Sequence, residues 1–250
     1  MSELAPPRLA AVVERIAGPE ASPDPLPPDI TGALADLAAW WRTVSGGSPL
    51  AATELDPDAP ASVPDAIIAG IEAAERAVDS GATLIVPRAR QRDNEAARTI
   101  IALLTRRESS AVVAQPLGMA DRDWMDACAA VRDRAAETAE HRGEPVALLE
   151  AVGAPGIALV VGVLLGAAAR RTPCLVDGTD ELAAALVADR LCIRAKAWWR
   201  AGSDSPDPGR AAAIDRIDLP AGLPLGLTDD AGRGAEATLA LLGLLAPPTP

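Results

Sequence analysis

Hydrophobic and polar residues follow two periods along this chain, and together they predict helices separated by short buried strands. Residues 65–81 place Ile67, Ile71 and Val78 near one face of an amphipathic helix, and Gly81 is a suitable residue to end it. The apolar run ATLIVP that follows predicts a short strand buried on both faces. This order of helix and buried strand is typical of a parallel sheet covered by helices.

The second half of the chain repeats this order. A helix over 157–170 is dense in Gly and Ala, so its backbone can lie close to a neighbour. The strand PCLVDG and the helix ELAAALVADRLC follow, and AKAWWRAG fits either a strand or a helix end. Further helices are expected over NEAARTIIALLTRR, 121–141, 146–152, RAAAIDRIDL and GAEATLALLGLLA. We therefore predict an α/β fold with a parallel sheet flanked by helices, in a Rossmann-like three-layer arrangement.

Residues 1–64 have a different pattern. Helices are expected over LAAVVERIAG and over 30–44, with a proline-rich linker between them. Residues 45–64 are rich in Gly, Pro, Ser and Asp, which predicts a loop. We expect two parts, with N-terminal helices and a linker in 1–64 and the α/β domain in 65–250.

Composition narrows the classes of partner. The net charge of −12 argues against nonspecific nucleic-acid binding, which needs a basic surface. The longest apolar run, 157–169, is too short to cross a bilayer, and the N-terminus lacks the features of a signal peptide. We therefore expect a cytoplasmic protein that binds neither nucleic acid nor membrane.

The residues that usually bind metals are scarce. The three cysteines are far apart, and His141 is the only histidine, so a zinc site of the Cys/His type is not expected. Cys174 lies in an apolar strand and is expected in the core. Nothing in the sequence implies a metal or a tightly bound cofactor. With no Phe or Tyr, the core must pack through small aliphatic side chains and some of the five Trp, and one member of each pair, Trp40-Trp41 and Trp198-Trp199, is expected there.

Several segments, in order, resemble nicotinate-nucleotide–dimethylbenzimidazole phosphoribosyltransferases. The segment LLEAVGAPGIALVVGVLLGAAARRTPCLVDG is similar to the family's VGGFEIAALAGAILGAAARRIPVVLDG, and AGSDSPDPGR stands where the family has AGHRSAEPGH. LPPDITGALADLAAWW, IEAAERAVDSGATLIVPRARQRDNEAA and GLPLGLTDDAGRGAEATLALLGLL also resemble family segments. The resemblance covers most of residues 27–245. It implies transfer of a phosphoribosyl group from nicotinate mononucleotide to a benzimidazole, in assembly of the lower ligand of cobalamin.

The resemblance also identifies candidate site residues. The family's GEMGIGNTT loop becomes PRARQRDNE, which keeps Asn94 and replaces glycines that would let backbone N–H groups approach a phosphate. Arg88 in this loop is a candidate to bind phosphate by charge. The other candidates for nucleotide or phosphate binding are retained family residues: Gly153, Asp177, Gly178, Ser205 and Gly209.

The catalytic position of the family departs from its pattern. The family's catalytic Glu lies in LGEGTGA, and without gaps it falls on Gly234, which cannot accept a proton. Glu236 is the candidate catalytic residue if the loop register shifts, with Asp204, Asp229 and Asp230 as other possible bases. The family's long segment before residue 65 is also reduced to SGGSPLAATELDPDAPASVP, which predicts a smaller sheet and an open site.

Two hypotheses follow from these departures. The chain is either a divergent phosphoribosyltransferase with a rearranged site, or a noncatalytic protein that binds a nucleotide or a benzimidazole-like base or pairs with a partner. The loss of the family's Glu and glycines favours the second. Family members commonly form homodimers, and the small-residue helix at 157–169 is a candidate surface for such packing.

Overall fold

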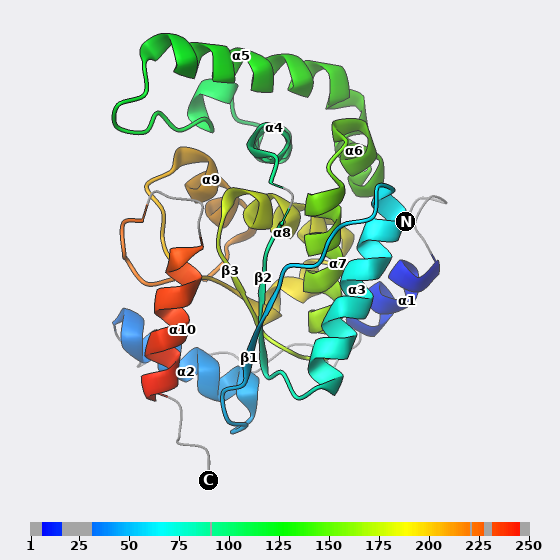
Figure 1. Cartoon of the computed structure of the whole chain (residues 1–250), viewed down its shortest axis with the longest axis vertical. Coiled ribbons are helices and arrows are strands. Elements are labelled where there is room, and N and C mark those ends of the chain that lie inside the picture. The colour runs from blue at the N-terminus through cyan, green and yellow to red at the C-terminus, as the bar shows by residue number, and fades with distance from the viewer. Residues whose placement is uncertain (1–6, 17–31, 91, 221, 228–231, 246–250) are drawn as a thin grey trace.

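The computed structural model describes residues 7–16, 32–90, 92–220, 222–227 and 232–245. Within them, four short strands form one sheet in the order β1-β2-β3-β4, and every neighbouring pair is parallel (Figure 1). The strands are β1 (Ala52–Leu55), β2 (Leu84–Pro87), β3 (Cys174–Val176) and β4 (Trp199–Ala201). The predicted α/β fold with a parallel sheet flanked by helices is confirmed.

One strand lies where a loop was expected. Residues 45–64 contain β1, whose Glu54 stands opposite Val86 of β2. The strand ATEL has four residues, none of them fully buried, so it carries no buried apolar run that would have revealed it. The sheet therefore begins earlier in the chain than the hydrophobic pattern indicates.

The helices fall close to the predicted segments. Ser62 caps the third helix through its side chain, and Pro64 is in its first turn, so the local sequence fixes that start. The segment AKAWWRAG contains both a helix end and a strand, because the 3-10 helix η3 (Ile193–Trp198) is followed directly by β4. The α-helices are α1 (Pro7–Ile16), α2 (Ala33–Ser45), α3 (Val63–Asp79), α4 (Asn94–Thr105), α5 (Asp121–Thr138), α6 (Pro145–Val152), α7 (Pro155–Ala169), α8 (Thr179–Leu191), α9 (Pro208–Ile217) and α10 (Arg233–Leu245).

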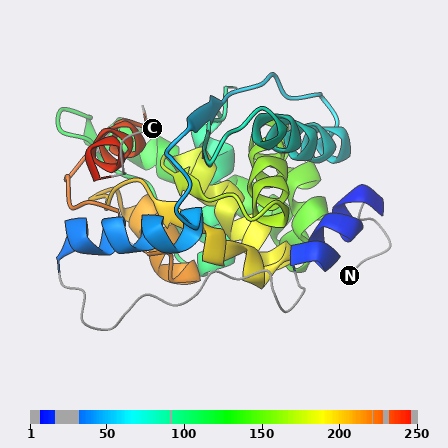
Figure 2. The same cartoon turned by 90° about the horizontal axis from the view of Figure 1, so that it is seen from below.

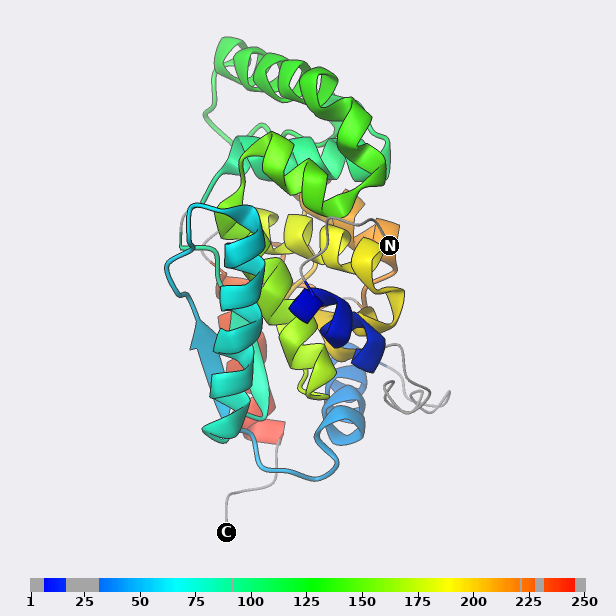
Figure 3. The same ribbon diagram turned by 90° about the vertical axis from the view of Figure 1, so that its right-hand side faces the viewer.

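The helices form layers around the sheet. Helices α1, α3 and α7 lie on one side of it, and α2 and α10 lie on the other, as Figures 1 and 2 show from two directions. Helices α4, α8 and α9 gather beyond the sheet, and α5 lies farthest from it, packed over α4 (Figure 3).

Helices α3 and α7 approach each other through glycine. A Cβ at Gly162 would lie 2.0 Å from the Ile67 carbonyl oxygen, and a Cβ at Gly70 would lie 2.0 Å from that of Leu159. Residues 156–168 of α7 are all buried within this chain. This corrects the expectation that 157–169 offers a surface for a second copy, because the chain's own helices already cover it.

More tryptophan side chains are buried than the sequence predicts. Both members of each pair, Trp40-Trp41 and Trp198-Trp199, are buried, which corrects the expectation of one per pair. Arg200 of β4 lies over the Trp40 ring, 5.7 Å from its centre, and burial lowers the pKa of this guanidinium. Cys174 is fully buried, as expected, and burial raises the pKa of its thiol.

Candidate functional site

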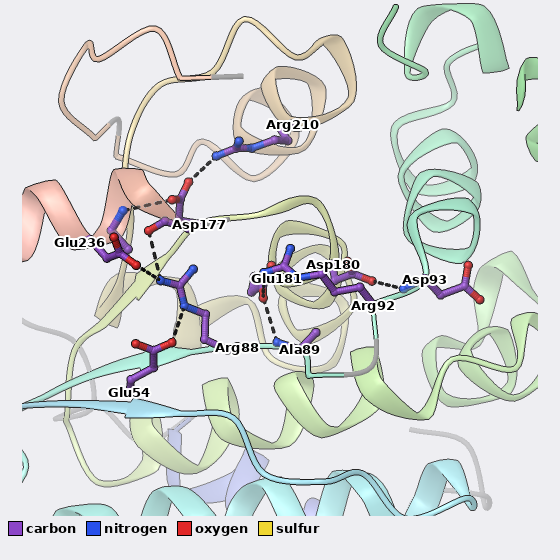
Figure 4. A network of polar contacts seen from close by, with 12 residues as sticks. Glu54, Arg88, Ala89, Arg92, Asp93, Asp177, Asp180, Glu181, Arg210 and Glu236 are labelled. Carbon is purple, nitrogen blue, oxygen red and sulfur yellow. Dashed lines mark hydrogen bonds and ion pairs between the residues drawn. The ribbon is translucent and has the colours of Figure 1, made fainter. Parts of the chain in front are cut away.

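The carboxyl ends of β2, β3 and β4 meet at one edge of the sheet, which we call the carboxyl edge. Because parallel strands end together, the segments after them converge there although they are far apart in sequence. Arg88 follows β2, Asp177 follows β3, and Glu236 lies in the first turn of α10 (Figure 4). Ser203, which follows β4, and Gly234 of α10 lie beside Asp177. The polar residues around these positions form an extended set of contacts within the chain.

Asp177 is the central carboxylate of the carboxyl edge. It is buried and ion-paired with the buried Arg210 of α9, while its other oxygen accepts a hydrogen bond of 3.0 Å from the Ala235 backbone N–H. The bond from Ala235 joins β3 to the N-terminus of α10, where a negative charge is also favoured by the helix dipole. Asp177 therefore holds two neighbouring elements in place and has both oxygens engaged.

Gly234, where the resemblance predicts the family's catalytic residue, is packed against this carboxylate. A Cβ at Gly234 would lie 2.2 Å from Ser203 Oγ and 2.9 Å from an Asp177 oxygen. Ser203 Oγ is itself buried and has no hydrogen-bond partner among the described residues. The first turn of α10 thus lies so close to the segment after β4 that a side chain at position 234 could not be accommodated without movement of its neighbours.

Arg88 fills the space between β1, β2 and α10. Its guanidinium is buried, lies 3.0 Å from Glu54 Oε1 and 3.6 Å from Glu236 Oε1, and donates to the Gly232 carbonyl at 3.1 Å. The Glu54 and Glu236 side chains are 56% and 64% exposed, so each carboxylate reaches the arginine from the solvent side. The charge of Arg88 is therefore balanced within the chain.

The loop after β2 is held by two buried acids of α8. Glu181 Oε1 accepts from the Ala89 N–H at 2.8 Å, and Asp180 Oδ1 accepts from the Asp93 N–H at 3.1 Å (Figure 4). Burial raises the pKa of Glu181 to about 7, and the neighbouring Asp180 adds to this, while the Ala89 hydrogen bond and the Arg92 charge oppose it. Carboxylate oxygens of α8 thus take the backbone donors of this loop.

A cavity of about 610 Å³ lies beside this loop, between α4, α5 and the start of α9. Asn94 and Arg98 of α4 line one wall, and Asp207 lies in the wall that leads into α9. Asp207 caps α9 and pairs with Arg98 at 2.7 Å, so the polar wall is rigid. The remaining lining is mostly apolar: Val113, Pro116, Leu117, Met119, Ala127, Ala130, Val131, Pro206 and Pro208.

The structure brings some predicted site residues together and separates others. Arg88, Asp177, Gly178 and Glu236 belong to the carboxyl edge, and Gly178 has φ 120°, which favours glycine. The remaining positions lie elsewhere: Asn94 lines the 610 Å³ cavity, Ser205 and Gly209 flank its Asp207 wall, and Gly153 lines a separate hollow with Pro64 and Glu150.

The other residues predicted as possible catalytic bases lie in different surroundings. Asp204 is exposed, and its Oδ1 accepts from the Gly226 N–H at 3.4 Å. Asp229 and Asp230 lie outside the described residues. Glu236 is the candidate base nearest to Gly234 in the chain, and it is engaged with Arg88.

Sequence reasoning missed several charged groups at these sites. Glu54 lay in the presumed loop, and Asp180 and Glu181 had the appearance of ordinary acidic residues in a first helical turn. Arg210 and Asp207 were visible only as neighbours of the retained Gly209. Among the described residues, no group of three or more His, Cys, Asp or Glu is placed to hold a metal ion.

Comparison with known proteins finds a matching family model and similar curated enzymes. Residues 59–245 match the model of a family described as phosphoribosyltransferase. The chain is 40% identical over 178 residues to nicotinate-nucleotide–dimethylbenzimidazole phosphoribosyltransferase from Mycobacterium leprae, covering 71% of this chain and 51% of the relative. It is 39% identical over 175 residues to the enzyme of that name from Streptomyces avermitilis, covering 69% and 46%.

The fold is shared with a solved structure. CobT from Thermus thermophilus matches with a TM-score of 0.72 at 21% identity, covering 96% of this chain and 95% of that one. The chain spans about half the length of the curated relatives it matches. No helix within the described ranges combines the length and the apolar character that a membrane span requires.

Proposed function

Because the chain belongs to the phosphoribosyltransferase family that its match over 59–245 defines, we propose that it keeps the family's small-molecule binding without its group transfer. Its ligand is a nicotinate nucleotide or a benzimidazole-like base, the compound classes in the names of the enzymes it resembles. The observation that carries this proposal is the packing at Gly234. A proton acceptor is absent from that position, and the backbone lies against Ser203 and Asp177.

The neighbouring groups support the same conclusion. A transferred phosphoribosyl group needs donors around its phosphate, but the Ala89 and Asp93 N–H groups are taken by Glu181 and Asp180. Arg88, the predicted phosphate-binding cation at the carboxyl edge, is engaged by Glu54 and Glu236. Ligand phosphate would therefore have to displace carboxylates that the fold already holds there.

The cavity of about 610 Å³ is the binding place in this proposal. Its volume lies within the range of small-molecule sites, and its apolar walls with a few fixed polar groups suit a flat aromatic base. The Asn94 and Arg98 side chains would orient the polar part of the ligand. Arg98 is held by Asp207, so little conformational freedom is lost on binding.

A rearranged catalyst is the second candidate. The observation that favours it is the 64% exposed side chain of Glu236, whose carboxylate lies at the carboxyl edge and 3.6 Å from Arg88. If a ligand replaced Glu236 on Arg88, the freed carboxylate would be available as a general base.

Calorimetric titration and a turnover assay test these alternatives. We expect nicotinate mononucleotide or dimethylbenzimidazole to bind, and Ala130→Phe to weaken binding at least about tenfold by filling the cavity. Ala136→Phe, at an exposed site on the same helix and outside this cavity, is the matched control and should bind normally. Chromatography of a mixture with both compounds should show no α-ribazole phosphate.

Other results of these two experiments would contradict the proposed binding role. Failure of both compounds to bind would refute the binding role. Product formation that Glu236→Gln abolishes would establish the rearranged catalyst instead, and product that survives this substitution would place the base elsewhere.

A further inference from the structure

A second hollow, of about 300 Å³, lies at the C-terminal ends of α4, α8 and α9, where the 3-10 helix η2 (Ala139–Gly143) closes one side. Four arginines from these four elements line it: Arg106, Arg142, Arg190 and Arg216. Glu140 is the one acidic residue in this described lining. Three net positive charges thus surround a small space in a chain whose net charge is −12.

Most of these arginines form no close ion pair with an acidic residue among the described residues. Arg216 donates through Nε to the Leu104 carbonyl at 3.2 Å. The side chains of Arg106, Arg142 and Arg190 make no hydrogen bond or ion pair with another described residue, whereas most other arginines in the described ranges are paired. The unpaired guanidinium groups are therefore concentrated at this hollow.

The acidic groups near the hollow, Glu140 and Asp189, offset part of its positive charge. Glu140 is 80% exposed and turns toward His141, with 3.5 Å between Oε1 and Nε2. Asp189 is partly buried, and burial raises the pKa of its carboxyl, while the charges of Lys196, Arg216 and Arg190 oppose that rise. The field of these cations thus reaches the groups around the hollow.

Helix dipoles explain part of this arrangement. Arg190 and Arg216 lie in the last turns of their helices, and Arg106 is the C-cap of α4, where a cation is favoured. The dipole acts within one turn of each helix and gives no reason for three helix ends and Arg142 to share one hollow. Like charges brought together repel, and a bound anion removes that repulsion.

We propose that this arginine hollow binds a small phosphorylated anion, at a site distinct from the carboxyl edge and from the 610 Å³ cavity. Guanidinium groups present paired N–H donors that match phosphate oxygens, and four of them would complement two linked phosphates. A volume of about 300 Å³ accommodates a compact diphosphate and is too small for a macromolecular segment. The proposal stands on these residues and does not depend on the function of the cavity.

Inorganic pyrophosphate is the probe for this site. Calorimetric titration at constant ionic strength should show saturable binding of one pyrophosphate per chain. The double variant Arg142→Gln/Arg190→Gln should weaken it at least about tenfold, because two charge-assisted contacts are lost. Both side chains are exposed, so the fold should be retained, and circular dichroism would verify this.

The control carries the same charge change on another surface. Arg122→Gln/Arg132→Gln alters two exposed arginines of α5 and should leave pyrophosphate binding unchanged. Equal weakening in both double variants would reduce the effect to net charge and overturn the proposal, as would absence of saturable binding to the native chain. Titration with nicotinate mononucleotide separates the two sites, because the arginine hollow variant should bind it normally if the cavity is its site.

Discussion

Gly162→Ala should lower the free energy of unfolding by about 3 kcal/mol, at the upper end of the usual cost of overpacking. The added Cβ would stand 2.0 Å from the Ile67 carbonyl oxygen and 3.0 Å from the Gly70 Cα. Both contacts are backbone atoms, so no side-chain rotation can relieve them. Helices α3 and α7 would have to separate, and the apolar residues between them would lose packing.

Urea denaturation followed by tryptophan fluorescence would measure this loss, because Trp40, Trp41, Trp198 and Trp199 are all buried. Gly243→Ala is the matched control, since it adds the same methyl group in the last turn of α10, where no neighbouring atom lies within 4 Å of the added carbon. It should be neutral or stabilise the chain by up to about 1 kcal/mol through helix propensity. Similar destabilisation by both substitutions would contradict the steric explanation.

The same contact illustrates what the sequence could predict of the fold. The Gly- and Ala-rich pattern of 157–170 indicated a helix in close contact with a neighbour, and α7 fulfils this against α3. The pattern could not say whether that neighbour belonged to the same chain. Strand β1 escaped prediction because its pairing with β2 uses backbone groups, and its four side chains have no distinctive hydrophobic pattern.

For the candidate site too, only part of the arrangement could be predicted from the sequence. The resemblance predicts that Gly234 replaces the family's catalytic Glu, and the structure adds that Gly234 is tightly packed against Ser203 and Asp177. The contacts of Glu181 with Ala89, and of Glu54 with Arg88, join residues 92 and 34 positions apart. Local sequence carries no signal for such pairs. The roles assigned to Asn94, Ser205 and Gly209 remain predictions that ligand binding must test.

The buried acid Glu181 should make stability depend on pH. Its folded-state pKa of about 7 lies above the ordinary value of 4.5, so the folded chain retains a proton that the unfolded chain releases. Stability from this group is therefore greatest below pH 4.5, falls as the pH rises to about 7, and stays low above that. The loss is on the order of 3 kcal/mol, since one pKa unit corresponds to about 1.36 kcal/mol.

Glu181→Gln removes the titrating group while keeping a carbonyl oxygen that can accept from the Ala89 N–H. The free energy of unfolding of this variant, minus that of the native chain, should rise by about 3 kcal/mol between pH 4.5 and pH 7.5. Urea titrations across that range would measure it, with Glu137→Gln at an exposed position of α5 as the control for the charge change. An equal rise in the control, or a constant difference for Glu181→Gln, would mean that the buried carboxyl is not what penalises folding at neutral pH. If the rise is confined to Glu181, the desolvation of its buried carboxylate outweighs the Ala89 hydrogen bond and the Arg92 charge, which both favour the ionised form.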